Sequence, residues 1–194
     1  MEELEYNPDM PAMTLEEFLA WELQQEEKHE FVDGEIIAFA GGKNRHHWLA
    51  IELILVIAPH ARPCRTGGSD TSVQMKNSAR YPDVVVTCDE RDTLDEQVVR
   101  YPTLIVEVLS ESTAMTDRTE KLAEYTAIET LQEYLLVDSR KHWAQIFRRS
   151  SEGFTMLPAV QNGKLHLSSI DLVIDLDKLY SQASWPQKGD QIST

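Results

Sequence analysis

The sequence lacks any apolar run long enough to cross a membrane, and its 194 residues include only two cysteines. A spanning helix needs about 20 consecutive apolar residues, so no membrane segment is expected. Residues 1–5 are acidic and lack the basic and apolar regions of a secretory signal. Cys64 and Cys88 offer neither a disulfide framework nor the ligand spacing of a zinc site. We therefore expect a cytoplasmic protein whose core needs no disulfide or structural metal.

Basic residues are scarce, because 18 Lys and Arg stand against 33 Asp and Glu, a net charge of −15. Residues 1–35 hold 12 acids and one lysine, a balance of −11, which leaves only −4 for the other 159 residues. Binding to a phosphate backbone depends on local positive potential and not on whole-chain charge. The composition thus argues against tight non-specific DNA binding without excluding an enzyme that acts on nucleic acid.

Local signals predict an N-terminal helix and a β-hairpin. Residues 14–17 (Thr-Leu-Glu-Glu) form a capping box that opens a helix to about residue 25. Asp33-Gly34 separates two short apolar runs and is a strong signal for a tight hairpin turn. No repeat, low-complexity tract or interdomain linker interrupts the chain. One domain over residues 1–194 is therefore expected, with a flexible tail at 184–194.

The remaining elements follow from hydrophobic periodicity. Helices are predicted at 46–57, ended by Pro59 and Pro63, and at 116–128, and strands at 71–75, 84–86, 104–109, 133–137 and 143–148, with weaker signals at 153–157 and 164–167. This order predicts an α/β (α+β) domain. It would have a mixed central sheet flanked by helices on both sides, an N-terminal helix and hairpin, and a β-rich C-terminal extension.

Two carboxylates occupy positions where a strand should be buried. Glu107 lies in the run 104–109, whose apolar residues point to both faces, and Asp83 directly precedes the apolar residues 84–86. A buried, ionised carboxylate needs a cation, hydrogen bonds or a raised pKa. Pairing with an arginine, such as Arg80 or Arg118, is one solution. A divalent metal shared by both acids is the other, because Mg²⁺ uses one or two carboxylates with waters and a substrate phosphate as ligands.

The spacing of these acids resembles the acidic core of the PD-(D/E)XK, restriction-endonuclease-like superfamily. Pro82-Asp83 is followed by Glu107 after 107 − 83 = 24 residues. Within that superfamily the chain is most similar to a bacterial family of putative restriction endonucleases. The matching segments are 29–35, His46, 81–86, Pro102, 117–118, Lys121, Tyr125 and 133–138, which together span about residues 14–148. The resemblance implies a restriction-endonuclease-like nuclease core in which Asp83 and Glu107 bind the metal.

One departure concerns the lysine of the superfamily's Glu-x-Lys pattern, because this chain has Leu109 where that lysine would stand. The family resemblance places the lysine on the following helix, at Lys121. Lys121 also lies four residues after Asp117, so a surface ion pair along the helix is the alternative interpretation.

Further candidates are a histidine and three acids. His46 matches the family histidine at the start of its helix, where it would contact a phosphate or orient a water, and residues 43–47 are a candidate phosphate-binding segment. A solvated helix start with two incidental histidines is the alternative interpretation. Glu30 and Glu35 flank the hairpin turn; we expect at most one to face the site and favour Glu30. Glu52 replaces a family asparagine; a further metal ligand and a solvated helix residue are the two interpretations, and we favour the second.

The predicted function is Mg²⁺-dependent hydrolysis of DNA phosphodiester bonds, with Mn²⁺ as a substitute and no organic cofactor. DNA and a second copy of the chain are the expected partners, since many superfamily nucleases dimerise to cut two strands. Two alternatives remain. The fold could serve as a catalytically inactive DNA- or protein-binding module, with its acids paired to arginines. It could also form a closed pocket for a smaller phosphoester.

Overall fold

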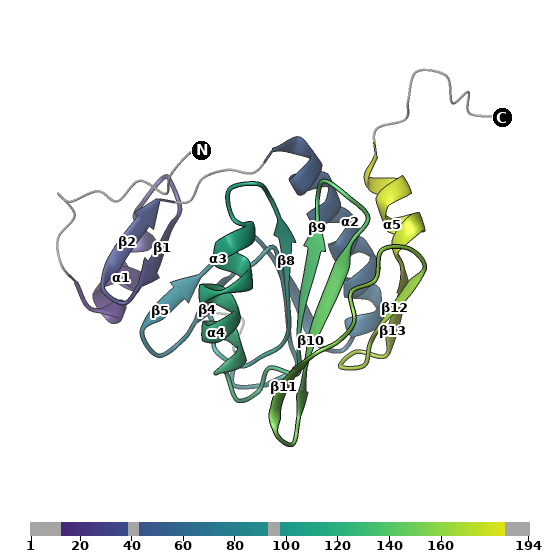
Figure 1. Cartoon of the computed structure of the whole chain (residues 1–194). Coiled ribbons are helices and arrows are strands. Elements are labelled where there is room, and N and C mark those ends of the chain that lie inside the picture. The colour runs from purple at the N-terminus through teal and green to yellow at the C-terminus, as the bar shows by residue number, and fades with distance from the viewer. Residues whose placement is uncertain (1–12, 39–42, 93–97, 185–194) are drawn as a thin grey trace.

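The computed structural model describes residues 13–38, 43–92 and 98–184 (Figure 1). The acidic segment 1–12 and all of the predicted tail except Ser184 lie outside these ranges. No helix in the described part of the chain is long and apolar enough to span a bilayer.

A six-stranded mixed sheet forms the centre of the protein, with strand order β11-β10-β9-β8-β6-β3. The strands are β3 (Arg65–Gly68), β6 (Val84–Thr87), β8 (Pro102–Leu109), β9 (Glu133–Asp138), β10 (Ala144–Ser150) and β11 (Gly153–Met156). Strands β8 and β9 are parallel, and the other neighbours pair antiparallel. Seven of the eight residues of β8 and all six of β9 are buried. This burial is typical of strands whose sheet is covered on both faces.

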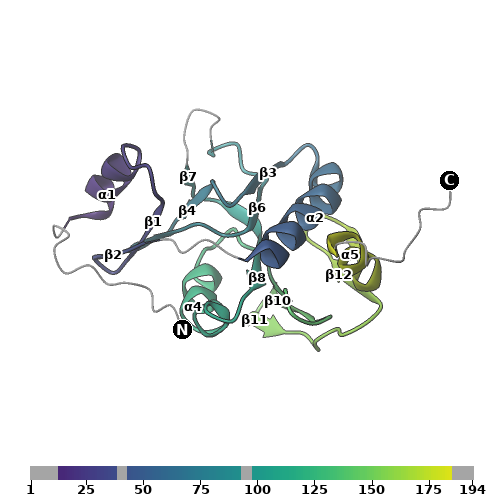
Figure 2. The same cartoon turned by 90° about the horizontal axis from the view of Figure 1, so that it is seen from above.

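Helices cover both faces of this sheet. On one face lie α2 (Asn44–Ala61) and α5 (Leu176–Ala183), and on the other lie α3 (Ala114–Arg118) and α4 (Glu120–Thr126). Figure 2 shows α2 and α5 on one side of the strands and α4 on the other. Alternate residues of β8 serve the two sides, because Val106 packs with α2 and Ile105 packs with Tyr125 of α4. The odd-numbered residues of β8, Glu107 among them, therefore face α4.

A smaller, five-stranded sheet lies beside the central one, in the order β2-β1-β5-β4-β7. Its strands are β1 (His29–Val32), β2 (Glu35–Ala38), β4 (Ser72–Gln74), β5 (Ser78–Arg80) and β7 (Val98–Val99), and α1 (Leu15–Glu22) packs against it. The predicted capping box of α1 is present, as is the predicted hairpin between β1 and β2. Asp33 and Gly34 both have positive φ, at 48° and 97°, as a tight two-residue hairpin turn requires.

The strand predicted at 71–75 was assigned to the wrong sheet. It forms β4 of the smaller sheet, and β3 occupies the place next to β6 in the central sheet. The sequence did not predict β3 because Gly67 and Gly68 are poor strand formers. A Cβ atom at Gly67 would collide with the side chain of Thr71, so the tight chain reversal after β3 requires a glycine there.

Two predicted helix boundaries are wrong. Helix α2 continues through Pro59 to Ala61. A proline in the last turn costs a backbone donor, but Ile57 and Ala61 on either side of it are buried in the core. The helix predicted at 116–128 is instead two short helices, α3 and α4, which meet at Thr119 in a non-helical backbone conformation (φ −121°, ψ −79°).

The C-terminal extension is only partly β. It consists of the hairpin β12 (Lys164–Leu167) and β13 (Leu172–Asp175) followed by α5. Leu165, Ile174 and Leu179 belong to the same hydrophobic cluster as α2 and β8. The extension therefore completes the cover over the α2 face of the central sheet.

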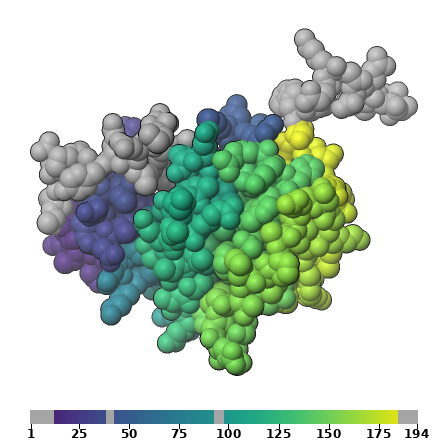
Figure 3. Space-filling model, viewed as in Figure 1, coloured from purple at the N-terminus to yellow at the C-terminus, as the bar shows by residue number. Residues whose placement is uncertain are grey.

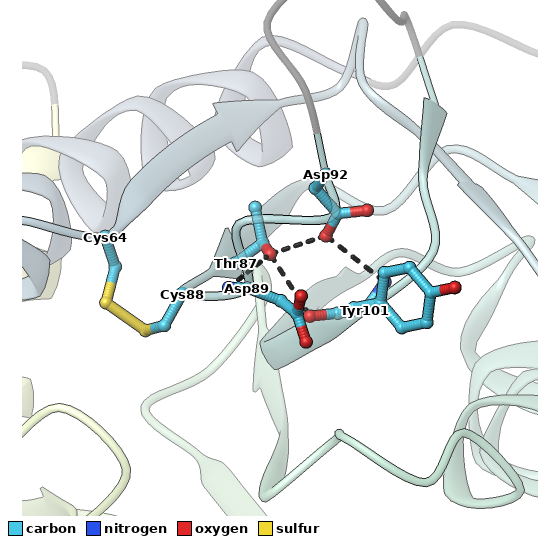
Figure 4. Close-up of a disulfide and its surroundings, with 6 residues drawn as sticks. All are labelled: Cys64, Thr87, Cys88, Asp89, Asp92 and Tyr101. Atoms are coloured by element: carbon cyan, nitrogen blue, oxygen red, sulfur yellow. Dashed lines mark hydrogen bonds between the residues drawn. A yellow bond between two sulfur atoms is a disulfide. The ribbon is translucent and has the colours of Figure 1, made fainter.

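The two cysteines form a disulfide, contrary to the expectation from their spacing. Figure 4 shows Cys64 and Cys88 joined beside the Thr87 and Asp92 hydrogen bonds. Because Arg65 pairs with Thr87 in the antiparallel β3–β6 ladder, the next residues outward, Cys64 and Cys88, lie opposite each other, with Cα atoms 4.4 Å apart. The two cysteines are close because of the register between β3 and β6. Their spacing along the chain does not encode that register.

Candidate functional site

Asp83 and Glu107 lie side by side at the junction of β6 and β8. In this antiparallel pair Val84 is opposite Val106, so extending the register by one residue places Asp83 opposite Glu107, on the same face of the sheet. Both side chains are almost fully buried, with relative exposures of 6% and 3%. The ladder thus brings together two acids that are 24 residues apart in the sequence.

Asp83 is bound through one oxygen to neighbouring elements. Its Oδ2 accepts a 2.7 Å hydrogen bond from the backbone N–H of Val108 and lies 3.2 Å from Nε2 of His46. Burial alone would lower the pKa of His46, but the hydrogen bond and charge of Asp83 outweigh it, and the pKa is raised. His46, from the first turn of α2, therefore reaches the predicted site and favours its charged form there.

Glu107 is bound through one oxygen to α4. Its Oε1 accepts hydrogen bonds from Nζ of Lys121 and from the hydroxyl of Tyr125, both at 3.0 Å. The same ammonium lies 3.1 Å from Oδ1 of Asp117. Lys121 is only 7% exposed and Asp117 only 1%. The predicted spacing of four between Asp117 and Lys121 thus does produce an ion pair, but a buried one, directed at Glu107 and not at solvent.

Acids outnumber bases around Lys121. Burial raises the pKa of Glu107 well above its ordinary value; the charge of Lys121 opposes this, while Asp117 and Asp83 add to it. Burial would lower the pKa of Lys121, but Glu107, Glu30 and Asp117 raise it well above the ordinary value. The lysine is therefore charged. The neighbouring carboxylates repel one another, and this repulsion favours the binding of a further cation.

Glu30 reaches the edge of this cluster from β1. It accepts hydrogen bonds from the side chain of Arg80, at 2.9 Å, and from the backbone N–H of Tyr81, at 3.1 Å, and lies 3.8 Å from Nζ of Lys121. Burial would raise the pKa of Glu30, but the charges of Lys121 and Arg80 lower it. Glu35 is exposed on the hairpin, so of these two acids only Glu30 lies near the site.

A fully buried arginine was not predicted as part of this network. Arg80 binds Glu30 and also donates two hydrogen bonds to Glu124 of α4, at 2.9 and 2.8 Å. It thereby ties the smaller sheet to the helix that carries Lys121. Neither Asp83 nor Glu107 pairs with Arg80 or Arg118: Arg80 binds Glu30 and Glu124, and Arg118 lies over the ring of Trp143 at 4.3 Å. The alternative of arginine-paired acids is therefore wrong.

Asp117 and Tyr125 also join the site. Oδ1 of Asp117 is buried without a hydrogen bond, since its contact with Lys121 is close but not aligned as one. Both residues fell within matching segments of the family resemblance, yet neither was predicted as a site residue, because polar residues near a helix surface are usually solvated. Glu52 is half-buried on α2.

The free oxygens of the two acids suit a hard cation. Within residues 13–38, 43–92 and 98–184, no donor hydrogen-bonds to Oδ1 of Asp83 or to Oε2 of Glu107. No group of three or more His, Cys, Asp or Glu side chains in these ranges is arranged to hold a metal ion. Two carboxylates alone fit Mg²⁺, which completes its shell with water and substrate oxygens, and do not fit zinc, which takes three or four protein ligands.

Comparisons with known proteins agree with this fold. Residues 15–176 match the sequence profile of the Uma2 family, described as "Putative restriction endonuclease". Two proteins of Synechocystis sp. PCC 6803 are similar: uncharacterized protein slr1290 is 38% identical over 175 residues, which cover 88% of this chain and 92% of that protein, and uncharacterized protein sll1609 is 39% identical over 132 residues, which cover 65% and 75%.

A solved structure shares the architecture. The crystal structure of a "putative nuclease belonging to DUF820" from Anabaena variabilis ATCC 29413 superimposes with a TM-score of 0.73 at 18% sequence identity, covering 89% of this chain and 99% of that one. At this identity the likeness concerns the fold. It confirms the predicted fold class, a mixed α/β arrangement of the nuclease kind.

Proposed function

Because the chain belongs to the Uma2 family of putative restriction endonucleases, we propose that it is a metal-dependent endonuclease that hydrolyses phosphodiester bonds in DNA. The observation that carries the proposal is the pairing of Asp83 with Glu107 across β6 and β8, next to a buried lysine. Oδ1 of Asp83 and Oε2 of Glu107 would hold Mg²⁺, or Mn²⁺ in its place. When bound, the ion would lower the pKa of a water ligand and neutralise charge on the phosphodiester.

Lys121 is the cationic group of the proposed site. Its stem is buried and its ammonium is held by Glu107 and Asp117, at 3.0 and 3.1 Å. A charge fixed in this way needs little reorganisation to stabilise negative charge that develops in the transition state, or to orient the attacking water. The hydroxyl of Tyr125 binds the same oxygen of Glu107 and so helps to turn the other oxygen toward the metal position.

His46 and Glu30 have positioning roles in this proposal. The contact of His46 with Oδ2 of Asp83, together with the backbone N–H of Val108, orients that carboxylate and leaves Oδ1 available. Glu30, held by Arg80 at 2.9 Å, contributes negative charge that keeps Lys121 protonated. Both residues act through a neighbouring side chain.

A cleavage assay on supercoiled plasmid and on single-stranded DNA, with Mg²⁺ or Mn²⁺, tests the function directly. We expect cleavage by the wild type and none by Glu107→Gln, because the amide lacks the charge that a metal ligand needs. Glu107→Gln should unfold at a temperature close to that of the wild type, since the amide oxygen can still accept the hydrogen bonds of Lys121 and Tyr125. Glu52→Gln, a half-buried acid on α2, is the matched control and should cut normally.

The catalytically inactive binding module is the second candidate. It is favoured by one contact, because Lys121 already neutralises Glu107 without a metal. DNA binding by a wild type that cuts neither substrate with either metal would support this module and contradict the enzyme. Equal cleavage by Glu107→Gln and wild type would place the activity elsewhere.

We further propose that DNA is the main partner, that no organic cofactor takes part, and that two copies associate so that both strands are cut. The cytoplasm remains the proposed location. Light scattering coupled to size-exclusion chromatography, with and without DNA, distinguishes one copy from two.

A further inference from the structure

A groove opens at the edge of the central sheet formed by the C-terminal ends of β8 and β9. It has a volume of about 500 Å³ and lies between the first turns of α2, the turn after β9 and the end of α5. Figure 1 shows these segments along one edge of the molecule, and the same blue, green and yellow surfaces adjoin in Figure 3. Its lining includes Arg45, Trp48, Ser139, Lys141, His142 and Tyr180. We call it the Trp48 groove.

Two segments connect the Trp48 groove with the proposed active site. Ser139 donates hydrogen bonds from its backbone N–H and its hydroxyl to the carbonyl of Leu109, at 3.1 and 2.8 Å, which is two residues beyond Glu107 on β8. Between Arg45 and Trp48 in the same helical turn stands His46, which contacts Asp83. The groove therefore begins within one helical turn of the side chain that contacts Asp83.

The groove is positive although the protein carries a net charge of −15. Four basic residues line it, Arg45, Arg140, Lys141 and His142. Two of them already contact an acid, because Arg140 is paired with Asp138 at 2.9 Å and His142 lies 3.3 Å from Asp177. Arg45 and Lys141 are exposed and form no ion pair within the described ranges. Local positive potential of this kind fits a phosphate backbone.

The groove also presents flat aromatic surface. Trp48 is 46% exposed, whereas the other large hydrophobic side chains that are exposed among the described residues are aliphatic or methionine. The ring of His142 stacks on Tyr180, with centroids 4.3 Å apart. Bases stack on aromatic side chains with little sequence preference, at about 1–3 kcal/mol per base. A base within a duplex has both faces covered by its neighbours and cannot make this contact without being unstacked.

We propose that the Trp48 groove binds an unpaired nucleotide next to the cleaved bond, with its base stacked on Trp48 and its phosphate near Arg45 and Lys141. The backbone N–H groups at the start of α2 add to the phosphate site, since Lys43 gives this helix no side-chain cap. The inference rests on the proposed function and narrows its substrate class to single-stranded or locally unpaired DNA.

Binding measured without cleavage tests the groove independently of the enzyme activity. The probes are a fluorescein-labelled oligothymidylate and a blunt duplex of equal length, titrated in EDTA with the Glu107→Gln protein. We expect the single strand to bind more tightly than the duplex. Trp48→Ala should weaken single-strand binding about tenfold, and Trp48→Phe should restore most of it because a flat ring is kept.

Charge variants and matched controls complete the test. Lys141→Glu should weaken binding and lower its dependence on salt, because one phosphate contact is lost. Leu55→Ala, which changes an exposed apolar residue of α2, and Lys164→Glu, which changes an exposed lysine of β12, should bind like the parent protein.

Equal affinity of Trp48→Ala and the parent protein for the single strand would overturn the proposed binding role of the groove. Tighter binding of the duplex than of the single strand would overturn the preference for unpaired DNA. If the wild type never cuts DNA but single-strand binding depends on Trp48, the proposed nuclease activity is refuted and the proposed binding role of the groove is supported.

Discussion

At the scale of single residues, the protein buries several charged side chains. Lys121, Asp117, Glu107 and Arg80 are each less than a tenth exposed, and each is held by at least one partner of opposite charge. Buried pairs contribute little net stability compared with apolar residues, but removing one partner strands the other. Such charges are therefore expected where function, and not stability, requires them.

The variant Lys121→Met allows the contribution of this lysine to stability and its contribution to cleavage to be measured separately. The variant keeps much of the apolar stem but leaves Glu107 and Asp117 without their cation, so the free energy of unfolding should fall by about 3–5 kcal/mol. Cleavage should slow by about 10²-fold or more, the scale for loss of one transition-state donor. Urea unfolding and single-turnover cleavage measure the two quantities.

The double variant Glu107→Gln/Lys121→Met is the control for this prediction. It should regain a large part of the lost stability, because the stranded charge of Glu107 is gone, while remaining inactive. Wild-type cleavage by Lys121→Met would show that the lysine has no part in the reaction, and a double variant no more stable than Lys121→Met would show that the two side chains are not coupled.

At the scale of elements, β3 is the strand that depends most on its neighbours. It lies at the edge of the central sheet, has β6 as its one strand partner among the described residues, and contains two glycines. The disulfide between Cys64 and Cys88 closes the chain at the outer end of this pair. Disulfides persist mainly in oxidising compartments, so the proposed cytoplasmic location implies that these thiols would be kept reduced there.

Reduction of this disulfide should destabilise the protein. The bond closes a loop with a sequence separation of 24 residues, for which the lost entropy of the unfolded chain corresponds to about 3 kcal/mol. We expect the urea midpoint to fall by the corresponding amount when dithiothreitol is present. In the Cys64→Ser/Cys88→Ser variant the midpoint should already be low and should not respond to the reductant. A wild-type urea midpoint that does not change with reductant would show that the disulfide does not stabilise the protein.

At the scale of the whole molecule, a buried acid joins the C-terminal extension to the central sheet. Glu133, at the start of β9, has a fully buried side chain. It accepts hydrogen bonds from the backbone and hydroxyl groups of Ser168 and Ser169, in the loop between β12 and β13, and one from Arg148 at 2.8 Å. The attachment of β12, β13 and α5 thus depends in part on one ionised carboxylate.

The stability of the protein should accordingly depend on the ionisation of Glu133. Burial alone would raise its pKa, but the hydrogen bonds of Ser169 and the charge of Arg148 hold the pKa below the ordinary value of 4.5. The unfolded chain therefore takes up this proton at a higher pH than the folded one. The stabilisation is present above about pH 4.5 and is lost as the pH falls through the lower, folded pKa.

Urea unfolding between pH 7 and pH 3 measures this effect. Glu133→Gln should be less stable at neutral pH and should lose less stability on acidification than the wild type. Glu152→Gln, which changes an exposed acid in the turn before β11, should follow the wild-type profile. Parallel pH profiles for Glu133→Gln and wild type would contradict the assignment.

Local features of this protein were determined by the sequence alone, because their causes act within a few residues. The capping box at Thr14 and the Asp33-Gly34 turn were predicted and are present. The two acids could also be singled out, since a carboxylate inside an apolar strand is anomalous wherever the strand lies. Their register, one opposite the other, needed the family resemblance or the structure.

Contacts across the sheets were decided only by the tertiary structure. The strand β3, the pairing of Cys64 with Cys88, and the insertion of Arg80 between β1 and α4 all depend on which strands become neighbours. Neighbouring strands of this sheet come from segments distant in the chain, and no local propensity encodes their register. The same reason explains why Lys121 is buried against Glu107: a spacing of four along a helix determines which side chains share a face, but packing decides whether that face meets water or a strand.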